Sequence, residues 1–482
     1  MLAAWLGAAW LFYPLTVGAN GRFPRAQRLI EDPRDPDHLV LAATYGLVTT
    51  RDRGQNWYHI CEASFSRLEM YVGDPLFEFA SDGTMLVDVQ AGLNRSTDEG
   101  CGWVTALGES DDDEVVDYTV SKTELGRVLA LRSSTEGGAI VIRLHESTDH
   151  GRAFLPMGSP LPVLTSFTVD LAPSDPARVY ATGISRTNAG YLLVSSDRGQ
   201  SWEARGIPNT SFDRIPYIAT IHPRDADKIF LRIDGRIFSD VDGRYHADDA
   251  VLYSDDGGNT WTEIHRAAGK ALGFALAPDA STLLIGYGAD GLFDVDEAAL
   301  GVYVSSTDRF AFDRLLDGST TCLSWTATGI YVCTPQSKAG RELAFAPRLT
   351  LGSNGAELEP LLKLPEIRGP LTCCDTARSA VCDSAWPTAC LVFQACGDAS
   401  APQACARDGG TKDGGGTLAD AGSTADAGTT SIPSRGCDCR TSAARARRDL
   451  APWWPGCLVA LVWARSVKTR RIAKRRWARP AA

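Results

Sequence analysis

The chain has 482 residues, of which 44% are hydrophobic and 22% are charged, with 46 glycines and 25 prolines. This is the composition of an ordinary folded protein, and it excludes a collagen-like, fully disordered or multi-span membrane protein. Residues 20–436 carry 36 basic and 57 acidic side chains, a net charge of −21, whereas residues 437–482 are basic; the acidic body argues against nucleic acid as a partner.

The N-terminus predicts an export signal. Residues 2–17 form an apolar run, and Val17-Gly18-Ala19 offers the small side chains that a signal peptidase requires. No Lys or Arg precedes Arg22, so the charged start of a standard signal peptide is missing, and a buried core helix is the alternative for this run. We predict a signal peptide over residues 1–19 and an exported protein.

A short motif recurs through the chain with the pattern Ser/Thr-x-Asp-x-Gly-x-x-Trp/Phe. Five copies begin at residues 50, 96, 147, 195 and 254, and a sixth copy at residue 306 lacks the glycine and is one residue shorter. The intervals between the motif aspartates run from 46 to 59 residues, a spacing typical of repeat architectures. The motif aspartates are Asp52, Asp98, Asp149, Asp197, Asp256 and Asp308, and the motif aromatics are Trp57, Trp103, Phe154, Trp202, Trp261 and Phe312.

The segments between the motif copies predict short strands. Residues 178–182 and 191–195 are runs rich in Val, Leu and Tyr that precede the fourth copy, and residues 202–204 follow it. Segments such as Pro173-Ser174-Asp175-Pro176 end one strand and start the next. No segment between copies has a long helical period, so each repeat is expected to be a small sheet.

These motif copies resemble the Asp-box, or BNR, repeats of β-propellers, a family that includes sialidases, xyloglucan-cleaving glycosidases and non-enzymatic propellers. The resemblance covers residues 20–372 and implies an all-β fold with a single propeller. A mean interval of about 51 residues predicts seven blades, with six as the alternative because residues 318–372 contain no motif. In the family the motif lies on an outer turn away from the ligand-binding face, so its aspartates and aromatics are expected to stabilise turns.

Catalytic residues cannot be selected from the sequence. Arg214-Ile215-Pro216 resembles part of the sialidase arginine motif, but it lies between the fourth and fifth copies rather than ahead of the first. A glycosidase would need two carboxylates across a cleft, and the candidates are Asp111, Asp112, Asp113, Glu114, Asp248, Asp249, Asp290, Asp294 and Asp296. We expect no cofactor and no metal, although Asp240-Val241-Asp242-Gly243 is a weak calcium signal without the full EF-hand spacing.

The cysteines predict disulfides. An exported chain with six cysteines over residues 373–405 favours a small module with three internal bonds, of open connectivity, over a zinc site, because no Cys-x-x-Cys pair is present. Within the propeller we expect Cys322 to pair with Cys333, and Cys61 with Cys101. The module cysteines are Cys373, Cys374, Cys382, Cys390, Cys396 and Cys405.

The C-terminal region predicts an anchor. Residues 406–436 are rich in Gly, Ala, Asp, Thr and Ser, a composition typical of a flexible linker. Residues 437–482 then contain Cys437-Asp438-Cys439, an apolar stretch over residues 450–464 and a basic tail. This order resembles the MYXO-CTERM sorting signals, which implies a membrane contact, a sorting protease and processing or lipid attachment at Cys437 or Cys439; a simple membrane tail is the alternative.

Together these features predict an exported β-propeller that is held at the cell surface or outer membrane by its C-terminus. We expect it to bind a glycan or a surface protein through its loop face without catalysis. A glycoside hydrolase on the same fold and an assembly factor are the alternatives, because one fold supports unrelated functions.

Overall fold

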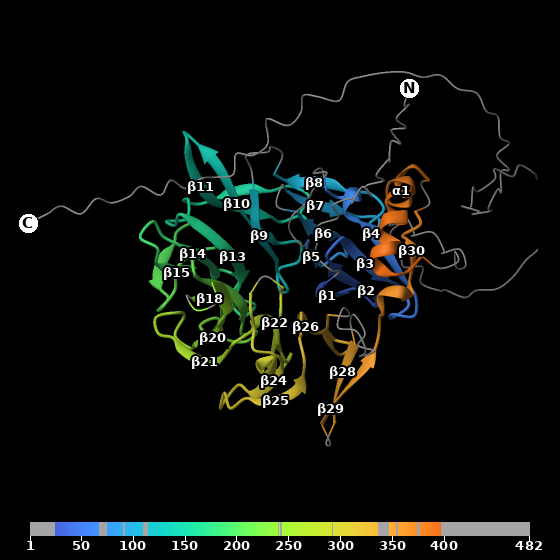
Figure 1. Cartoon of the computed structure of the whole chain (residues 1–482). Coiled ribbons are helices and arrows are strands. Elements are labelled where there is room, and N and C mark those ends of the chain that lie inside the picture. The colour runs from blue at the N-terminus through green and yellow to red at the C-terminus, as the bar shows by residue number, and fades with distance from the viewer. Residues whose placement is uncertain are drawn as a thin grey trace, which may run out of the picture. The chain divides into compact units, whose positions relative to one another are not determined.

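The described part of the chain forms seven four- or five-stranded sheets arranged around a central axis (Figure 1). The computed structural model describes residues 25–66, 75–89, 92–108, 114–239, 241, 243–291, 293–335, 347–352, 355–373 and 376–396. The predicted signal peptide, linker and C-terminal anchor lie outside these residues. The fold is an all-β propeller with seven blades, which confirms seven over six.

Each blade is an antiparallel sheet whose four principal strands follow one another in chain order. The strands of blades 1 to 3 are β1 (Ala26–Asp32), β2 (Asp35–Ala43), β3 (Gly46–Thr50), β4 (Trp57–Cys61); β5 (Leu76–Phe79), β6 (Met85–Asp88), β7 (Leu93–Ser96), β8 (Val104–Leu107); and β9 (Glu114–Val120), β10 (Val128–Glu136), β11 (Ala139–Ser147), β12 (Leu155–Met157).

Blades 4 to 7 repeat this order, and blade 5 carries one additional strand, β19, which pairs with β18. Their strands are β13 (Thr165–Leu171), β14 (Val179–Ile184), β15 (Gly190–Ser195), β16 (Glu203–Gly206); β17 (Arg214–Ile221), β18 (Ile229–Ser239), β19 (Arg244–Ala247), β20 (Asp249–Ser254), β21 (Thr262–Ala267); β22 (Lys270–Leu276), β23 (Thr282–Gly288), β24 (Gly301–Ser306), β25 (Asp313–Asp317); and β26 (Cys322–Trp325), β27 (Ile330–Cys333), β28 (Pro347–Gly352), β29 (Gly355–Pro360). The 3₁₀ turns are η1 (Glu62–Ser64), η2 (Glu297–Ala299) and η3 (Leu364–Glu366).

The first strand of each blade is the innermost. Strand β1 contacts β5 and β26, β9 contacts β5 and β13, and β13 contacts β17. The first strands therefore surround the central axis, and the fourth strands lie at the rim. Because successive strands are antiparallel, the turn between the third and fourth strands lies on the opposite face from the connection that leads to the next blade.

The hydrophobic core is divided into layers between neighbouring blades. In β2, Leu39 and Leu41 pack in the cluster shared with blade 7, whereas Val40 and Ala42 pack in the cluster shared with blade 2. Strand side chains alternate between the two faces of a sheet, so a strand covered on both faces needs an unbroken apolar run. This explains why second strands such as β2, β14 and β23 show apolar runs instead of alternation.

The C-terminal part of the described chain returns from blade 7 to blade 1. Strand β30 (Ile367–Pro370) pairs in parallel with β4, so that blade 1 gains a fifth strand. The helix α1 (Thr376–Phe393) follows and contacts β4, η1 and β30, and Phe393 is buried in the cluster between blades 7 and 1. We call residues 361–396 the C-terminal strap.

Disulfides attach this strap to the propeller. Cys61 pairs with Cys382, and Cys101 pairs with Cys373. The predicted Cys61–Cys101 pair is therefore wrong, and so is a module with three internal bonds, because the strap passes blades 1 and 2 and brings its own cysteines to them. The expected Cys322–Cys333 bond joins paired residues of β26 and β27.

The remaining disulfide of the described residues is internal to the strap and joins Cys390 to Cys396. Cys374 and Cys405 lie outside the described residues. None of the helices in the described ranges is long and apolar enough to cross a membrane.

We predict that the bond from blade 2 to the strap stabilises the fold more than the bond within the strap. With Cys61–Cys382 intact, the shortest loop closed by Cys101–Cys373 has roughly 50 residues, against a separation of 6 residues for Cys390–Cys396. The entropy that a bond removes from the unfolded chain grows with loop length, which gives about 4 against about 2 kcal/mol.

Denaturant unfolding of two double variants, Cys101→Ser with Cys373→Ser and Cys390→Ser with Cys396→Ser, measures this difference. Equal losses of unfolding free energy would contradict the role of the strap bond.

Candidate functional site

The two faces of the propeller carry different connections between strands. The six motif turns join third to fourth strands, and we call their side the motif face. The connections between second and third strands, and those between blades, lie on the other side, which we call the loop face.

Each of the five complete motif turns is built from the same three hydrogen bonds. In the fourth copy, the Ser195 hydroxyl donates to Asp197 Oδ1 at 2.7 Å, the Gly199 amide donates to the hydroxyl at 2.7 Å, and the Ser201 amide donates to Asp197 Oδ1 at 2.9 Å. The equivalent bonds form around Asp52, Asp98, Asp149 and Asp256. These carboxylates are therefore occupied by their own turns.

The hydrogen bonds also lower the pKa of motif carboxylates in the last three copies. The side-chain and backbone donors of Ser201 lower the pKa of Asp197 to about 2, and those of Thr260 lower the pKa of Asp256 to about 2. In the incomplete sixth copy, a hydrogen bond to Ser306 lowers the pKa of Asp308. A carboxylate held in this state is unsuited to proton transfer near neutral pH.

The motif glycine and aromatic pack against the preceding blade. Gly199 has a φ of +90°, and a Cβ at this position would lie 2.3 Å from Leu144 Cδ2 of blade 3. The other complete copies share this arrangement: Gly100, Gly151 and Gly258 face Ile60, Leu86 and Leu192 of the preceding blade, and Gly54 faces Leu361 at the start of the C-terminal strap. The aromatics Trp57, Trp103, Phe154, Trp202, Trp261 and Phe312 each join the hydrophobic cluster between their own blade and the preceding one.

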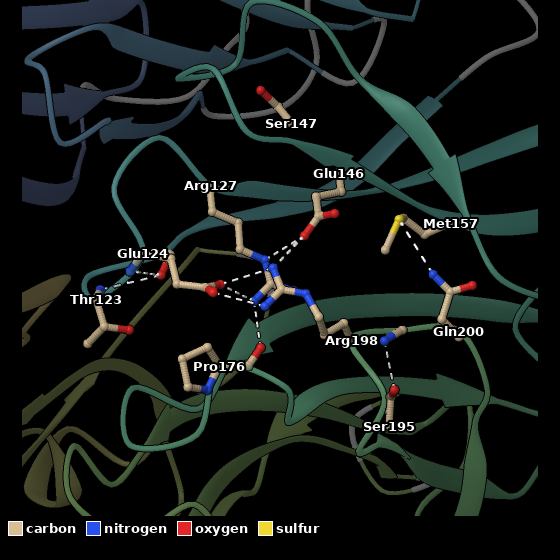
Figure 2. A network of polar contacts seen from close by, with 12 residues as sticks. Thr123, Glu124, Arg127, Glu146, Ser147, Met157, Pro176, Ser195, Arg198 and Gln200 are labelled. Carbon is tan, nitrogen blue, oxygen red and sulfur yellow. Dashed lines mark hydrogen bonds and ion pairs between the residues drawn. The ribbon is translucent and has the colours of Figure 1, made fainter.

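A buried ionic network on the motif face joins blades 3 and 4 (Figure 2). Arg127, whose side chain is 2% exposed, donates to Glu146 at 2.6 Å and to Glu124 at 2.7 Å, and also bonds to the carbonyl oxygen of Pro176. Arg198 of the fourth motif turn donates to Glu124 at 2.9 Å and lowers its pKa. All these charges are paired, so the network is structural.

Most of the carboxylates predicted as catalytic candidates on the loop face are paired with other groups. Asp248 accepts from Arg214 at 2.8 Å and also binds Arg266. Asp294 pairs with Arg244, and Asp296 caps η2 by accepting from the Ala298 amide. Asp290 accepts from the Phe293 amide at 3.3 Å, and Glu114 is an exposed residue at the start of β9. Asp111, Asp112, Asp113, Asp240 and Asp242 lie outside the described residues.

Asp249 is fully buried in an ionic cluster that includes a lysine missed by sequence reasoning. Its Oδ1 accepts from the Gly235 amide at 3.0 Å and from Lys270 Nζ at 3.0 Å, and its Oδ2 accepts from the Ala271 amide at 2.8 Å. Lys270 also pairs with Asp234. The cluster joins blades 5 and 6 immediately beneath the loop face, and it supplies no free carboxylate.

An aromatic hairpin extends from blade 5 above this cluster. We use this name for residues 236–239, 241 and 243–247, in which β18 and β19 pair Phe238 with Tyr245. The two side-chain rings lie 5.1 Å apart, and the residues are 51% and 47% exposed. Backbone hydrogen bonds of Ala247 and Asp294 fix the hairpin to the loop after β23.

The central channel holds a second group of charges, from the first strands of blades 1 to 4. Arg28 of β1 pairs with Glu78 of β5, and both line a cavity of about 160 Å³ together with Asp117 and Tyr118 of β9. Burial raises the pKa of Asp117 to about 7, although its Oδ2 accepts from the Val169 amide at 2.8 Å. The sequence gives no signal for Asp117, because it is one carboxylate within an ordinary strand.

Asp170 of β13 lies beside this cavity group. Its Oδ1 accepts from the Thr119 hydroxyl at 2.9 Å, and burial raises its pKa. Among the described residues, no group of three or more His, Cys, Asp or Glu side chains is arranged to hold a metal ion.

Similarity to known proteins is found in solved structures and not in the sequence comparisons. No protein-family profile and no curated protein matches this sequence. Among solved structures, an ancestral GH74 enzyme is 12% identical and has a TM-score of 0.49, covering 70% of this chain and 46% of its own. A GH74 enzyme from Niastella koreensis is 15% identical with a TM-score of 0.38, covering 67% and 54%.

An α-L-arabinanase from Penicillium chrysogenum is 14% identical with a TM-score of 0.37, covering 60% of this chain and 92% of its own. The chain spans about half the length of the two GH74 structures. These likenesses carry no argument about the activity of this chain, and its seven blades are established by its own strand pairing.

We predict that Asp117 makes stability fall as pH rises. Its folded pKa of about 7 exceeds the unfolded value of about 3.9, so the folded state binds more protons between these pH values. The contribution of Asp117 is complete below about pH 4 and is lost as pH rises through about 7. Asp117→Asn therefore leaves stability unchanged near pH 4 and raises it, relative to the parent, at pH 8.

Denaturant midpoints at pH 4, 5.5 and 8 measure this effect, with Asp313→Asn, an exposed carboxylate on β25, as the control. A constant difference between Asp117→Asn and the parent across these pH values would contradict a raised pKa.

Proposed function

We propose that this protein is an exported, surface-anchored propeller that binds a glycan on its loop face without cleaving it. The observation that carries the proposal is the exposed pair Phe238 and Tyr245, held at the tip of a hairpin that is fixed to the neighbouring loop. Exposed aromatic side chains in a rigid setting are typical of binding sites, since they offer large apolar surface at little entropic cost.

The size of the exposed patch favours a glycan over a protein. Apart from the two rings, the hairpin exposes Ile237 at 50% and Val241 at 99%. A stable protein interface needs about 800 Å² from each partner, which is more than the tip of one hairpin supplies. A sugar chain needs only one or two rings to stack on, so the patch matches its dimensions better.

The charges of the loop face support binding without catalysis. A glycosidase requires one carboxylic acid and one free carboxylate across the substrate. Asp248, Asp249 and Asp294 are each paired with Arg or Lys, and Asp296 caps a turn. Paired groups of this kind shape a surface and do not transfer protons to a substrate.

A glycoside hydrolase is the second candidate, and the central channel favours it. Asp117, with a pKa of about 7, has the property of a general acid. Its partner would be Glu78 or Asp170, but Glu78 is paired with Arg28, and Asp170 has a raised pKa of its own. The channel therefore offers an acid without a free base, which is why binding ranks first.

We further propose that the motif turns are Asp-box repeats and that residues 437–482 are a MYXO-CTERM-like sorting signal. The hydroxyl, carboxylate, glycine and aromatic of each complete turn support the first assignment. The order of cysteine, apolar segment and basic tail supports the second.

The hairpin predicts a loss of binding on substitution. The double variant Phe238→Ala with Tyr245→Ala is expected to weaken retention on an immobilised polysaccharide at least tenfold, because the stacking surface is removed. The matched control is Leu125→Ala with Leu155→Ala, which removes two side chains of 79% and 70% exposure from the motif face. Equal retention of the two variants would contradict the hairpin site.

The anchor makes a separate prediction. Cys437→Ala is expected to release the protein from the cell surface and to change the mass of its C-terminal peptide, because processing or lipid attachment is lost. Cell fractionation and peptide mass analysis measure the two effects. Retention at the surface with an unchanged mass would exclude a sorting signal at Cys437.

A further inference from the structure

A second cavity, separate from the aromatic hairpin and from the Asp117 group, lies at the inner strands of blades 4, 5 and 6. Its volume is about 210 Å³, and its wall includes Thr168 of β13, Tyr217 of β17, Arg232 of β18 and Phe274 of β22. This volume is below that of a pocket for a drug-sized ligand. It suits a single sugar residue or the end of a chain.

The cavity wall contains a cation, Arg232, with N–H donors that are available to a ligand. The Arg232 guanidinium stacks over the Tyr217 ring, with Cζ 4.5 Å from the ring centroid, and Nη1 donates to the Ala271 carbonyl oxygen at 3.1 Å. Within the described ranges this is the one hydrogen bond of that side chain, whereas a guanidinium has five N–H donors. The stacked ring and the carbonyl hold its plane in place, so the remaining donors are already oriented.

The charged side chains in and behind the cavity wall have an excess of positive charge. Lys270, Arg232 and Arg236 surround the two carboxylates of Asp234 and Asp249, an excess of one positive charge when all are ionised. Burial opposes ionisation of Asp234, but Lys270, Arg232 and Arg236 bring its pKa below the ordinary value. Residues 20–436 are acidic overall, so the local excess of positive charge distinguishes this cavity from the rest of the propeller.

The shape of the donors indicates the ligand. A guanidinium offers two parallel N–H groups that match the two oxygens of a carboxylate. Burial raises the pKa of Tyr217, so its phenol stays neutral and retains a proton. The rings of Tyr217 and Phe274 add apolar surface beside the cation, which suits the carbon face of a sugar ring.

We propose that this cavity binds a uronate residue, with Arg232 bound to the sugar carboxylate. The proposal deepens the proposed function, on which it rests, because it names an acidic sugar within the class of glycans. The aromatic hairpin would then contact neighbouring residues of the same chain.

Titration calorimetry of the full chain with D-glucuronate, D-galacturonate, D-glucose and acetate tests the proposal. We expect at least one uronate to bind at least tenfold more tightly than glucose and than acetate, and its affinity to fall as salt concentration rises. Arg232→Gln is expected to abolish this preference. Arg143→Gln, a partly exposed arginine of β11 in blade 3, is the matched control and should leave it unchanged.

A second variant tests the proposal independently if Arg232→Gln fails to fold. Ala219→Leu fills the cavity from β17 while Arg232 is retained, and it should also abolish uronate binding. Uronate binding that survives in both folded variants, binding of acetate as tight as that of the uronates, or the absence of uronate binding would each overturn the proposal.

The result also separates this inference from the proposed function. Retention on neutral polysaccharide that depends on Phe238 and Tyr245, without uronate binding, would overturn the cavity proposal and leave glycan binding intact. Uronate binding that depends on Arg232 but not on the hairpin would support the cavity and contradict the hairpin.

Discussion

The propeller depends on the contact between each motif turn and the blade that precedes it. A hydroxyl and a carboxylate hold the turn, and this lets glycine take a positive φ where a side chain would collide with Leu or Ile of the neighbour. The motif aromatic then enters the same layer of the core. Because every complete copy repeats this contact, local turn chemistry is converted into the stacking of whole blades, and the loop face is left free for function.

Blade 7 has no such turn. At its junction with blade 1, the motif turn of blade 1 is joined by a second device. The chain supplies it by returning as β30 beside β4, with Leu361 against Gly54 and Phe393 in the shared core. Two disulfides then bind the strap to blades 1 and 2. The strap therefore supplies part of the surface against which the motif turn of blade 1 packs, at the junction where the first and last blades meet.

The sequence predicts the features of the fold that short repeated motifs determine. The spacing of Asp52 to Asp308 gives the repeat, and the interval gives seven blades even though the last has no motif. The partners of Cys61 and Cys101 could not be found, because they are 321 and 272 residues away and depend on how the strap returns. Lys270, Arg232 and Asp117 were missed for a related reason: their importance comes from burial and from charges on other blades, which no short motif records.

We rank binding above hydrolysis because most of the candidate acidic side chains are paired. Among the described loop-face residues, the carboxylates that looked catalytic in the sequence, apart from the exposed Glu114, are bound by arginine, by lysine or by backbone amides, whereas aromatic rings and one cationic cavity remain open to a ligand. The most direct measurement incubates the full chain with a panel of neutral and acidic polysaccharides and scores both retained protein and newly formed reducing ends. Our account predicts retention without release of reducing ends; release of reducing ends, lost in Asp117→Asn, would contradict it and identify the channel as a hydrolytic site.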